Sequence, residues 1–224
     1  MIPWSHLDTA QVPGGGELRL MRRGSEFSIK LGTNELMNSR LSATEQALAT
    51  IACDKIRARA RPTILIGGLG MGFTLRAALT VLGKQAKIIV AELVPAVLAW
   101  ARGPMAEVLG NCLTDPRVRI KEADVGDLIR SGRSAYDVIL LDVDNGPEGM
   151  TREANDGLYD LDGLAAAYRA LRPGGVLAIW SSRPDPKFTQ RLRKTGFDVV
   201  ENPVRAKGPQ GGAQHFIWTA MRGR

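Results

Sequence analysis

The feature that most constrains the fold is a regular alternation of short apolar runs with helix-like segments, which begins at residue 63. The apolar runs are rich in β-branched residues and short, so we interpret them as buried strands. Continuous apolar strands separated by helices are typical of a parallel sheet that helices cover on both faces. The strands are expected at residues 63–66, 86–91, 118–120, 136–141 and 176–180, and the helices near 72–82, 94–109, 125–131 and 161–171.

The last part of this alternation ends differently. A helix is expected near 187–194, and strands at 197–201 and 214–220 follow it, joined by a glycine-rich turn. Two strands that a turn connects directly run antiparallel. The sequence therefore predicts an α/β fold with a Rossmann-like sheet of seven strands, mostly parallel, whose last strand is antiparallel.

The first 60 residues have another pattern. Residues 17–31 contain two short apolar strands around a turn, which predicts a β-hairpin. Ser42 and Glu45 have the spacing of a capping box, in which the two side chains bond reciprocally to the first turn of a helix. We therefore divide the chain into a hairpin and helix appendage, residues 1–60, and a Rossmann-like domain, residues 61–224.

A turn rich in glycine follows the first strand of the alternation. Glycine allows a sharp backbone turn and lets a ligand approach the backbone amides closely. The helix that follows adds unpaired N–H groups and the positive end of its dipole. A strand, a glycine turn and a helix in this order predict a site for a nucleotide-like ligand, although a purely structural turn is the alternative. The glycines are Gly67, Gly68, Gly70 and Gly72.

Acidic residues follow the next two strands. Glu92 ends the second strand, 20 residues after Gly72, and Leu93 follows it. A carboxylate at this place can accept hydrogen bonds from both hydroxyls of a ribose. Asp124 follows the third strand, where its carboxylate and the amide of Val125 can contact an adenine ring. A helix N-cap is the equally simple interpretation of Asp124, and one residue can do both.

Asp142 ends the fourth strand, at the edge of the sheet where ligands of such folds bind. We expect it to accept a proton from a nucleophilic amine or hydroxyl group, or to orient the amino group of the ligand. Beyond it, Asp144, Asn145 and Tyr159 are candidates for binding a second substrate, although Asp144 could simply shape the loop. Trp180 is a further candidate for this wall.

Together these segments resemble the class I S-adenosylmethionine-dependent methyltransferase fold, and within it the spermidine synthase-like group. The resemblance extends over residues 17–220 and rests on IleGlyGlyLeuGlyMetGly, AspProArgValArgIle, TyrAspValIleLeuLeuAsp and LeuArgProGlyGlyValLeu. It implies S-adenosylmethionine or its decarboxylated form as the ligand, Asp142 as the catalytic aspartate, and an N-terminal hairpin that covers the site. It is also compatible with a homodimer.

The acceptor side departs from the pattern of this group. Its aminopropyltransferases usually have an aspartate where this chain has Gly70, a second aspartate at Asn145, and a Tyr-His pair at Thr44 and Glu45. Each departure removes a group expected to bind a cationic polyamine. We therefore expect methyl transfer to a small-molecule acceptor to be favoured, with aminopropyl transfer from decarboxylated S-adenosylmethionine as the alternative.

Other classes fit less well. An NAD-dependent oxidoreductase would use Glu92 similarly, but the glycine spacing and the reversed last strand argue against it; a non-catalytic adenosyl-binding domain is the other alternative. The net charge of +7 is spread along the chain, so we expect no nucleic-acid partner. The two cysteines and two histidines lack metal-ligand spacing, so no metal is expected. Without a membrane-length apolar run or a signal peptide pattern, we expect a cytoplasmic protein with no membrane contact.

Overall fold

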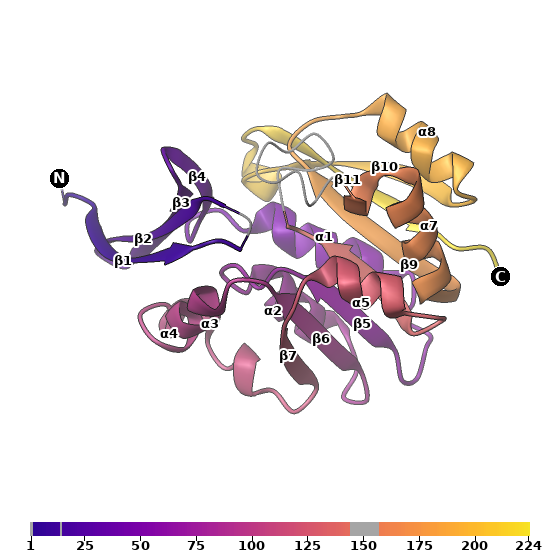
Figure 1. The fold of residues 1–224 in the computed structure, drawn as a ribbon, viewed down its shortest axis with the longest axis horizontal. Helices are drawn as coiled ribbons and strands as arrows, with labels where there is room; N and C mark the ends of the chain where they lie inside the picture. Colours follow the sequence, from indigo (N-terminus) through magenta and orange to yellow (C-terminus); the bar gives the residue numbers. More distant parts are fainter. Residues whose placement is uncertain (1, 14, 144–156) are drawn as a thin grey trace.

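The computed structural model describes residues 2–13, 15–143 and 157–224. It contains a four-stranded antiparallel sheet near the N-terminus and a seven-stranded sheet that forms the body of the molecule (Figure 1). The N-terminal sheet projects from one side of this body, and α1 (Ala43–Asp54) lies where the two parts meet.

The larger sheet confirms the predicted α/β class. The five strands from β9 to β7 are parallel, and β11 runs antiparallel to both of its neighbours. From one edge to the other, the strands are β10 (Asp198–Arg205), β11 (Gln214–Met221), β9 (Leu171–Ser181), β8 (Tyr136–Leu141), β5 (Thr63–Gly67), β6 (Lys87–Glu92) and β7 (Val118–Glu122).

Helices cover both faces of this sheet. On one face, α1, α2 (Phe73–Val81) and α3 (Pro95–Arg102) pack against side chains such as Ile64 and Ile66. On the other face, α5 (Val125–Ser131), α7 (Leu161–Ala170) and α8 (Pro186–Lys194) pack against side chains such as Leu65. Because successive strand residues point to opposite faces, one continuous apolar run supplies both cores. The expected helix at 94–109 is divided in two, and its second part is α4 (Ala106–Leu109). Two 3-10 helices, Cys112–Thr114 and Gly208–Gln210, and the helical residues 157–159 are further helical segments that the structure describes.

The N-terminal sheet is larger than the predicted hairpin. Its strands, in sheet order, are β1 (Ser5–Gln11), β2 (Glu17–Arg23), β3 (Glu26–Leu31) and β4 (Asn34–Asn38). The hairpin of β2 and β3 is confirmed. β1 is mostly exposed and polar, so it lacks the alternation of apolar residues that would have predicted it. The apolar cluster around α1 continues into β2 and β3, and the division of the chain at residue 60 stays a prediction.

The start of α1 corrects the capping-box prediction. The Ser42 side chain makes no capping bond; its Oγ accepts a hydrogen bond of 2.8 Å from Nε2 of Gln46 instead. The carboxylate of Glu45 accepts a hydrogen bond of 2.8 Å from the hydroxyl of Thr44. Glu45 therefore does not reach back to the backbone of Ser42, and its side chain is available for another role.

A buried carboxylate ties the base of the sheet together. Asp137 in β8 is 1% exposed and accepts hydrogen bonds of 2.6 Å from the amide of Thr63 and from Arg172. The guanidinium of Arg59, in the segment after α1, pairs with the same carboxylate. This cluster joins β5, β8, β9 and the end of the N-terminal region at one point.

Candidate active site

The order of the strands creates a crevice at the carboxyl end of β5. Gly67, the last residue of β5, pairs with Ala91 of β6 on one side and with Leu141 of β8 on the other. The chain leaves β5 toward β6 and later returns to β8 on the opposite side. Ligands of open α/β sheets bind at such a point, where the connections diverge.

A cavity of about 320 Å³ lies at this point, between the strand ends and the N-terminal sheet. The volume of this cavity falls within the range of small-molecule sites. Residues at the ends of four separate strands line it. Of the residues predicted to bind the adenosyl ligand, those that line it are Gly68, Gly70, Glu92, Leu93, Asp124, Val125 and Asp142. Their contacts with a ligand stay predictions.

The glycine turn has a structural reason as well as a possible binding role. Gly68 has a φ of +82°, and a Cβ there would lie 3.2 Å from the carbonyl oxygen of Asp142. Gly67 and Gly72 do not line the cavity: a Cβ on Gly67 would meet the side chain of Val125, and Gly72 precedes α2. These two glycines shape the turn rather than its inner surface.

Glu92 holds the glycine turn in place. Its carboxylate is 7% exposed and accepts hydrogen bonds from the amides of Leu69 and Val94, at 2.9 and 2.8 Å. Burial raises the pKa of Glu92, and the hydrogen bonds from backbone amides act in the opposite direction. Glu92 thus orders the glycine turn, and it also lines the cavity. Its contact with a ribose stays a prediction.

Asp124 is a helix N-cap that also lines the cavity. Its Oδ1 accepts a hydrogen bond of 2.7 Å from the amide of Gly126, which satisfies the first turn of α5. Both interpretations of this residue are compatible with its position. The cap is observed, and the contact with an adenine ring stays a prediction.

Asp142 and Glu45 are close enough for their charges to repel. Oδ2 of Asp142 accepts a hydrogen bond of 3.1 Å from Oγ1 of Thr74. Burial and, second, the charge of Glu45 raise the pKa of Asp142 to about 7, whereas the bond from Thr74 lowers it. Burial also raises the pKa of Glu45, and the hydroxyl of Thr44 opposes this. A carboxylate with this pKa can exchange a proton near neutral pH.

Glu45 lines the cavity, although the sequence analysis did not assign it to the site. It does so from α1 and precedes Asp142 by 97 positions. Its spacing from Ser42 suggested a helix cap. The only other signal was its place at the position of the family's Tyr-His pair.

The N-terminal sheet forms the apolar wall of the cavity. Met37 from β4 lies against the glycine turn: a Cβ on Gly70 would be 3.0 Å from its Sδ. The hairpin predicted to cover the site is therefore placed over it. The other apolar residues of this wall are Val12, Leu18, Ile29, Leu31 and Leu36.

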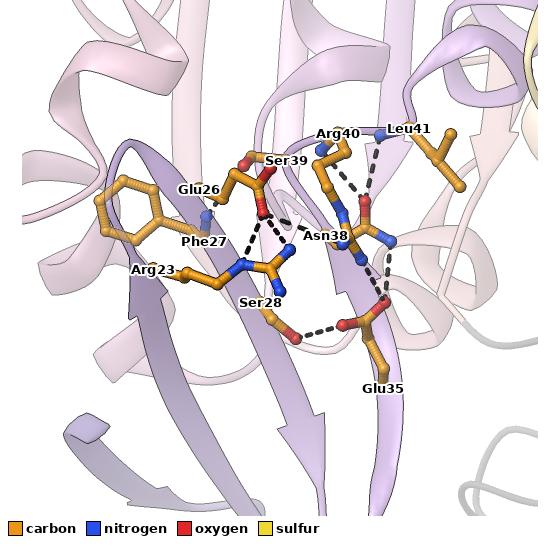
Figure 2. Close-up of polar contacts among 9 residues, drawn as sticks. All are labelled: Arg23, Glu26, Phe27, Ser28, Glu35, Asn38, Ser39, Arg40 and Leu41. Atoms are coloured by element: carbon orange, nitrogen blue, oxygen red, sulfur yellow. Dashed lines mark hydrogen bonds and ion pairs between the residues drawn. The ribbon is translucent and has the colours of Figure 1, made fainter. Parts of the chain in front are cut away.

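Figure 2 shows the polar contacts that shape the connection between β4 and α1. Oδ1 of Asn38 accepts hydrogen bonds from the amides of Arg40 and Leu41, at 3.0 and 3.1 Å. Oε2 of Glu35 accepts a hydrogen bond of 2.7 Å from the buried hydroxyl of Ser28. Asn38 and Leu41 also line the cavity, so these contacts fix the chain at its rim just before α1 begins.

Two aromatic side chains complete the described wall. Trp180 and His215 both line the cavity, and their rings meet edge to face with centroids 4.9 Å apart. Nε1 of Trp180 and Nδ1 of His215 are buried and have no hydrogen-bond partner among the described residues. Burial lowers the pKa of His215, which favours the neutral ring. Trp180 thus lines the cavity, and its role toward an acceptor stays a prediction.

The predicted acceptor residues are not gathered in the described part of the cavity. Asp144 and Asn145 lie outside the described residues. Tyr159 is buried in the core, with its ring edge to face with Phe188 at 5.9 Å, and is not among the residues that line the cavity. Its role toward an acceptor stays a prediction.

In the described part of the chain, no helix is both long and apolar enough to cross a membrane.

Spermidine synthases are among the solved structures with this fold. A spermidine synthase in complex with the transition state analogue AdoDATO is 19% identical, with a TM-score of 0.76, and the match covers 97% of this chain and 72% of that one. The spermidine synthase from Thermotoga maritima is 20% identical, with a TM-score of 0.76 over 97% of this chain and 73% of that one. No protein-family model matches the chain.

Curated relatives carry a related name. A polyamine aminopropyltransferase from Mycobacterium tuberculosis (strain ATCC 25618 / H37Rv) is 27% identical over 195 residues, which are 82% of this chain and 35% of that protein. Polyamine aminopropyltransferase 1 from Streptomyces coelicolor is 29% identical over 136 residues, 59% of this chain and 25% of that protein. The chain thus spans about a third of the length of the first of these relatives and about a quarter of the length of the second.

These comparisons correct one expectation and confirm another. The preference for methyl transfer is wrong, because the curated relatives are aminopropyltransferases and the similar structures are spermidine synthases. That expectation rested on the absence of carboxylates at Gly70 and Asn145. The structure shows that another carboxylate, that of Glu45, lines the cavity. The predicted spermidine synthase-like fold is confirmed.

Proposed function

We propose that this chain is a transferase that moves an aminopropyl group from decarboxylated S-adenosylmethionine to an amine. The observation that carries the proposal is the convergence of the glycine turn, Glu92, Asp124 and Asp142 on one cavity of about 320 Å³. The names of the curated relatives and of the similar structures support the type of group transferred.

The charge of the cavity favours the decarboxylated donor. Four carboxylates line it, those of Glu45, Glu92, Asp124 and Asp142, and no lysine or arginine does so among the described residues. The carboxylate of S-adenosylmethionine itself would be repelled at the acidic side of this cavity. The decarboxylated form has lost this group and keeps a positive charge, so the acidic lining attracts it.

The residues would act mainly by placing the two reactants. In the reaction, the neutral amine attacks the carbon next to the sulfonium in line. A C–N bond forms, and the C–S bond breaks to leave a neutral thioether. The amine carries an extra proton after the attack, and Asp142, with a pKa of about 7, is placed to accept it. Orientation of the reactants in a closed cavity supplies up to ~7–11 kcal/mol of the catalysis.

A comparison of ligands in thermal unfolding tests the proposal. A ligand at 100 times its dissociation constant stabilises a protein by ~2.7 kcal/mol. Decarboxylated S-adenosylmethionine should raise the melting temperature more than S-adenosylmethionine or NAD does. Release of 5′-methylthioadenosine should then require an added amine. Stronger stabilisation by either of the other two ligands, or release without an amine, would contradict the proposal.

A further inference from the structure

Two carboxylates, those of Glu45 and Asp142, line the same cavity. Glu45 and Asp142 are half-buried, and their hydrogen bonds come from hydroxyl groups, from Thr44 at 2.8 Å and from Thr74 at 3.1 Å. Among the described residues neither carboxylate forms an ion pair. A pair of like charges away from bulk water is unfavourable unless one group takes up a proton or a cation neutralises the pair. A cationic group of a ligand would relieve the repulsion and leave both carboxylates charged.

The position of this pair differs from the pattern of the family. At Gly70, where the family's aminopropyltransferases usually have an aspartate, the backbone φ is +51° and Met37 occupies the adjacent space. An aspartate there would be strained, and its Cβ would lie 3.0 Å from Sδ of Met37, which would have to shift. The cavity instead has the carboxylate of Glu45, which comes from α1.

We infer that Glu45 binds the reacting amine of the acceptor together with Asp142, and so replaces the family's missing amine-binding carboxylates. This inference rests on the proposed function, because it assigns the acceptor's end of the same cavity. An ammonium group between the two carboxylates satisfies both charges. It loses one proton to water before the attack, and the neutral amine stays next to Asp142, which accepts the proton that the amine carries after the attack. The substrate class this assigns is an aliphatic amine that is protonated in water.

The experiment replaces Glu45 by glutamine, which keeps the oxygen that accepts from Thr44 and removes the charge. Transfer from decarboxylated S-adenosylmethionine is measured with 1,4-diaminobutane and with n-butylamine as probes. A hydrogen bond to a charged group is lost, so KM for the amine should rise about tenfold to a hundredfold. Binding of 5′-methylthioadenosine should change less than twofold. Glu107→Gln, which removes an exposed carboxylate on α4, is the matched control and should change neither quantity.

The pH profile supplies a readout that a merely structural role would not move. The other titratable side chains that line the cavity are Glu92, Asp124 and His215. Only Glu45 repels the charged form of Asp142 among them. In the Glu45→Gln variant the acidic limb of the kcat/KM profile should therefore move to lower pH. Glu45→Asp keeps the charge and should bring KM back to within a few-fold of the original value.

Each outcome decides the matter. An unchanged KM together with an unmoved pH profile would overturn the inference and leave the proposed function intact. Weaker binding of 5′-methylthioadenosine and a lower melting temperature in Glu45→Gln, with no rescue by aspartate, would show a structural role and would also overturn it. No transfer to any amine by the unmodified chain would overturn the proposed function itself.

Discussion

The hydroxyl of Thr74, in the first turn of α2, donates a hydrogen bond of 3.1 Å to Oδ2 of Asp142 at the end of β8. This bond joins the helix that follows the glycine turn to the strand that carries the candidate proton acceptor. It favours the charged form of Asp142, against the burial and the neighbouring charge that disfavour it. The protonation of Asp142 is thus set by burial, by the charge of Glu45 and by the bond from Thr74, and single substitutions remove the last two.

Replacing Thr74 by valine should make Asp142 harder to ionise. The substitution keeps the branched shape and removes the donor, so the pKa of Asp142 rises further above its usual range. The acidic limb of the kcat/KM profile should move to higher pH, opposite to the shift expected for Glu45→Gln. Thr80→Val, at an exposed position near the other end of α2, is the control. A shift to lower pH would contradict this account of Asp142.

Asp142→Asn should remove most of the activity and leave donor binding largely intact. General-base catalysis contributes a factor of ~10²–10⁴ in rate, so kcat should fall by that order. The measurements are the rate of transfer and the thermal shift with 5′-methylthioadenosine. Unaltered turnover would exclude Asp142 from proton transfer.

The same substitution should make the unliganded protein more stable above neutral pH. The folded-state pKa of Asp142 is raised from 3.8 to about 7, so the folded protein binds this proton more tightly than the unfolded chain does. The stabilisation is complete below pH 3.8, decreases as the pH rises, and is lost above about 7. Urea unfolding should show the Asp142→Asn variant to be more stable than the original by on the order of 1 kcal/mol at pH 8. Equal stability at that pH would contradict the raised pKa.

Gly68→Ala should weaken both the fold and the binding of the donor. The φ of +82° disfavours any side chain, and the new Cβ would lie 3.2 Å from the carbonyl oxygen of Asp142. The free energy of unfolding should fall by about 1–2 kcal/mol, with a loss of the thermal shift given by the donor. Gly83→Ala is the control, because a Cβ there meets nothing within 4 Å and its φ is not positive. A Gly68→Ala variant as stable as Gly83→Ala would contradict this interpretation of the turn.

Asp137→Ala should be the most damaging of these changes to stability. It leaves the guanidinium groups of Arg59 and Arg172 and the amide of Thr63 without their shared buried partner. Breaking such a buried cluster costs about 3–5 kcal/mol, measured as the free energy of unfolding in urea. The exposed pair of Asp54 and Arg57 gives the comparison, since Asp54→Ala should cost less than about 1 kcal/mol.

Much of the fold and part of the site follow from local patterns. The strand and helix segments from residue 63 onward are encoded by short apolar runs and helix boundaries, which depend on neighbours in sequence. A residue that directly follows a parallel strand lies at the carboxyl edge of the sheet, whatever the order of the strands. Glu92, Asp124 and Asp142 could therefore be assigned to one edge from the sequence, and the structure places all three in the wall of one cavity.

The acceptor side was decided by the tertiary structure alone. Glu45 comes near Asp142, and Met37 lies against Gly70, only because the N-terminal sheet and α1 pack over the strand ends. No local sequence pattern predicts such a contact, because the spacing of residues along the chain does not determine which distant segment a side chain will face. The same reason explains why Glu45 could be assigned to a helix cap: its spacing fits one, and only packing shows that the residue lines the cavity.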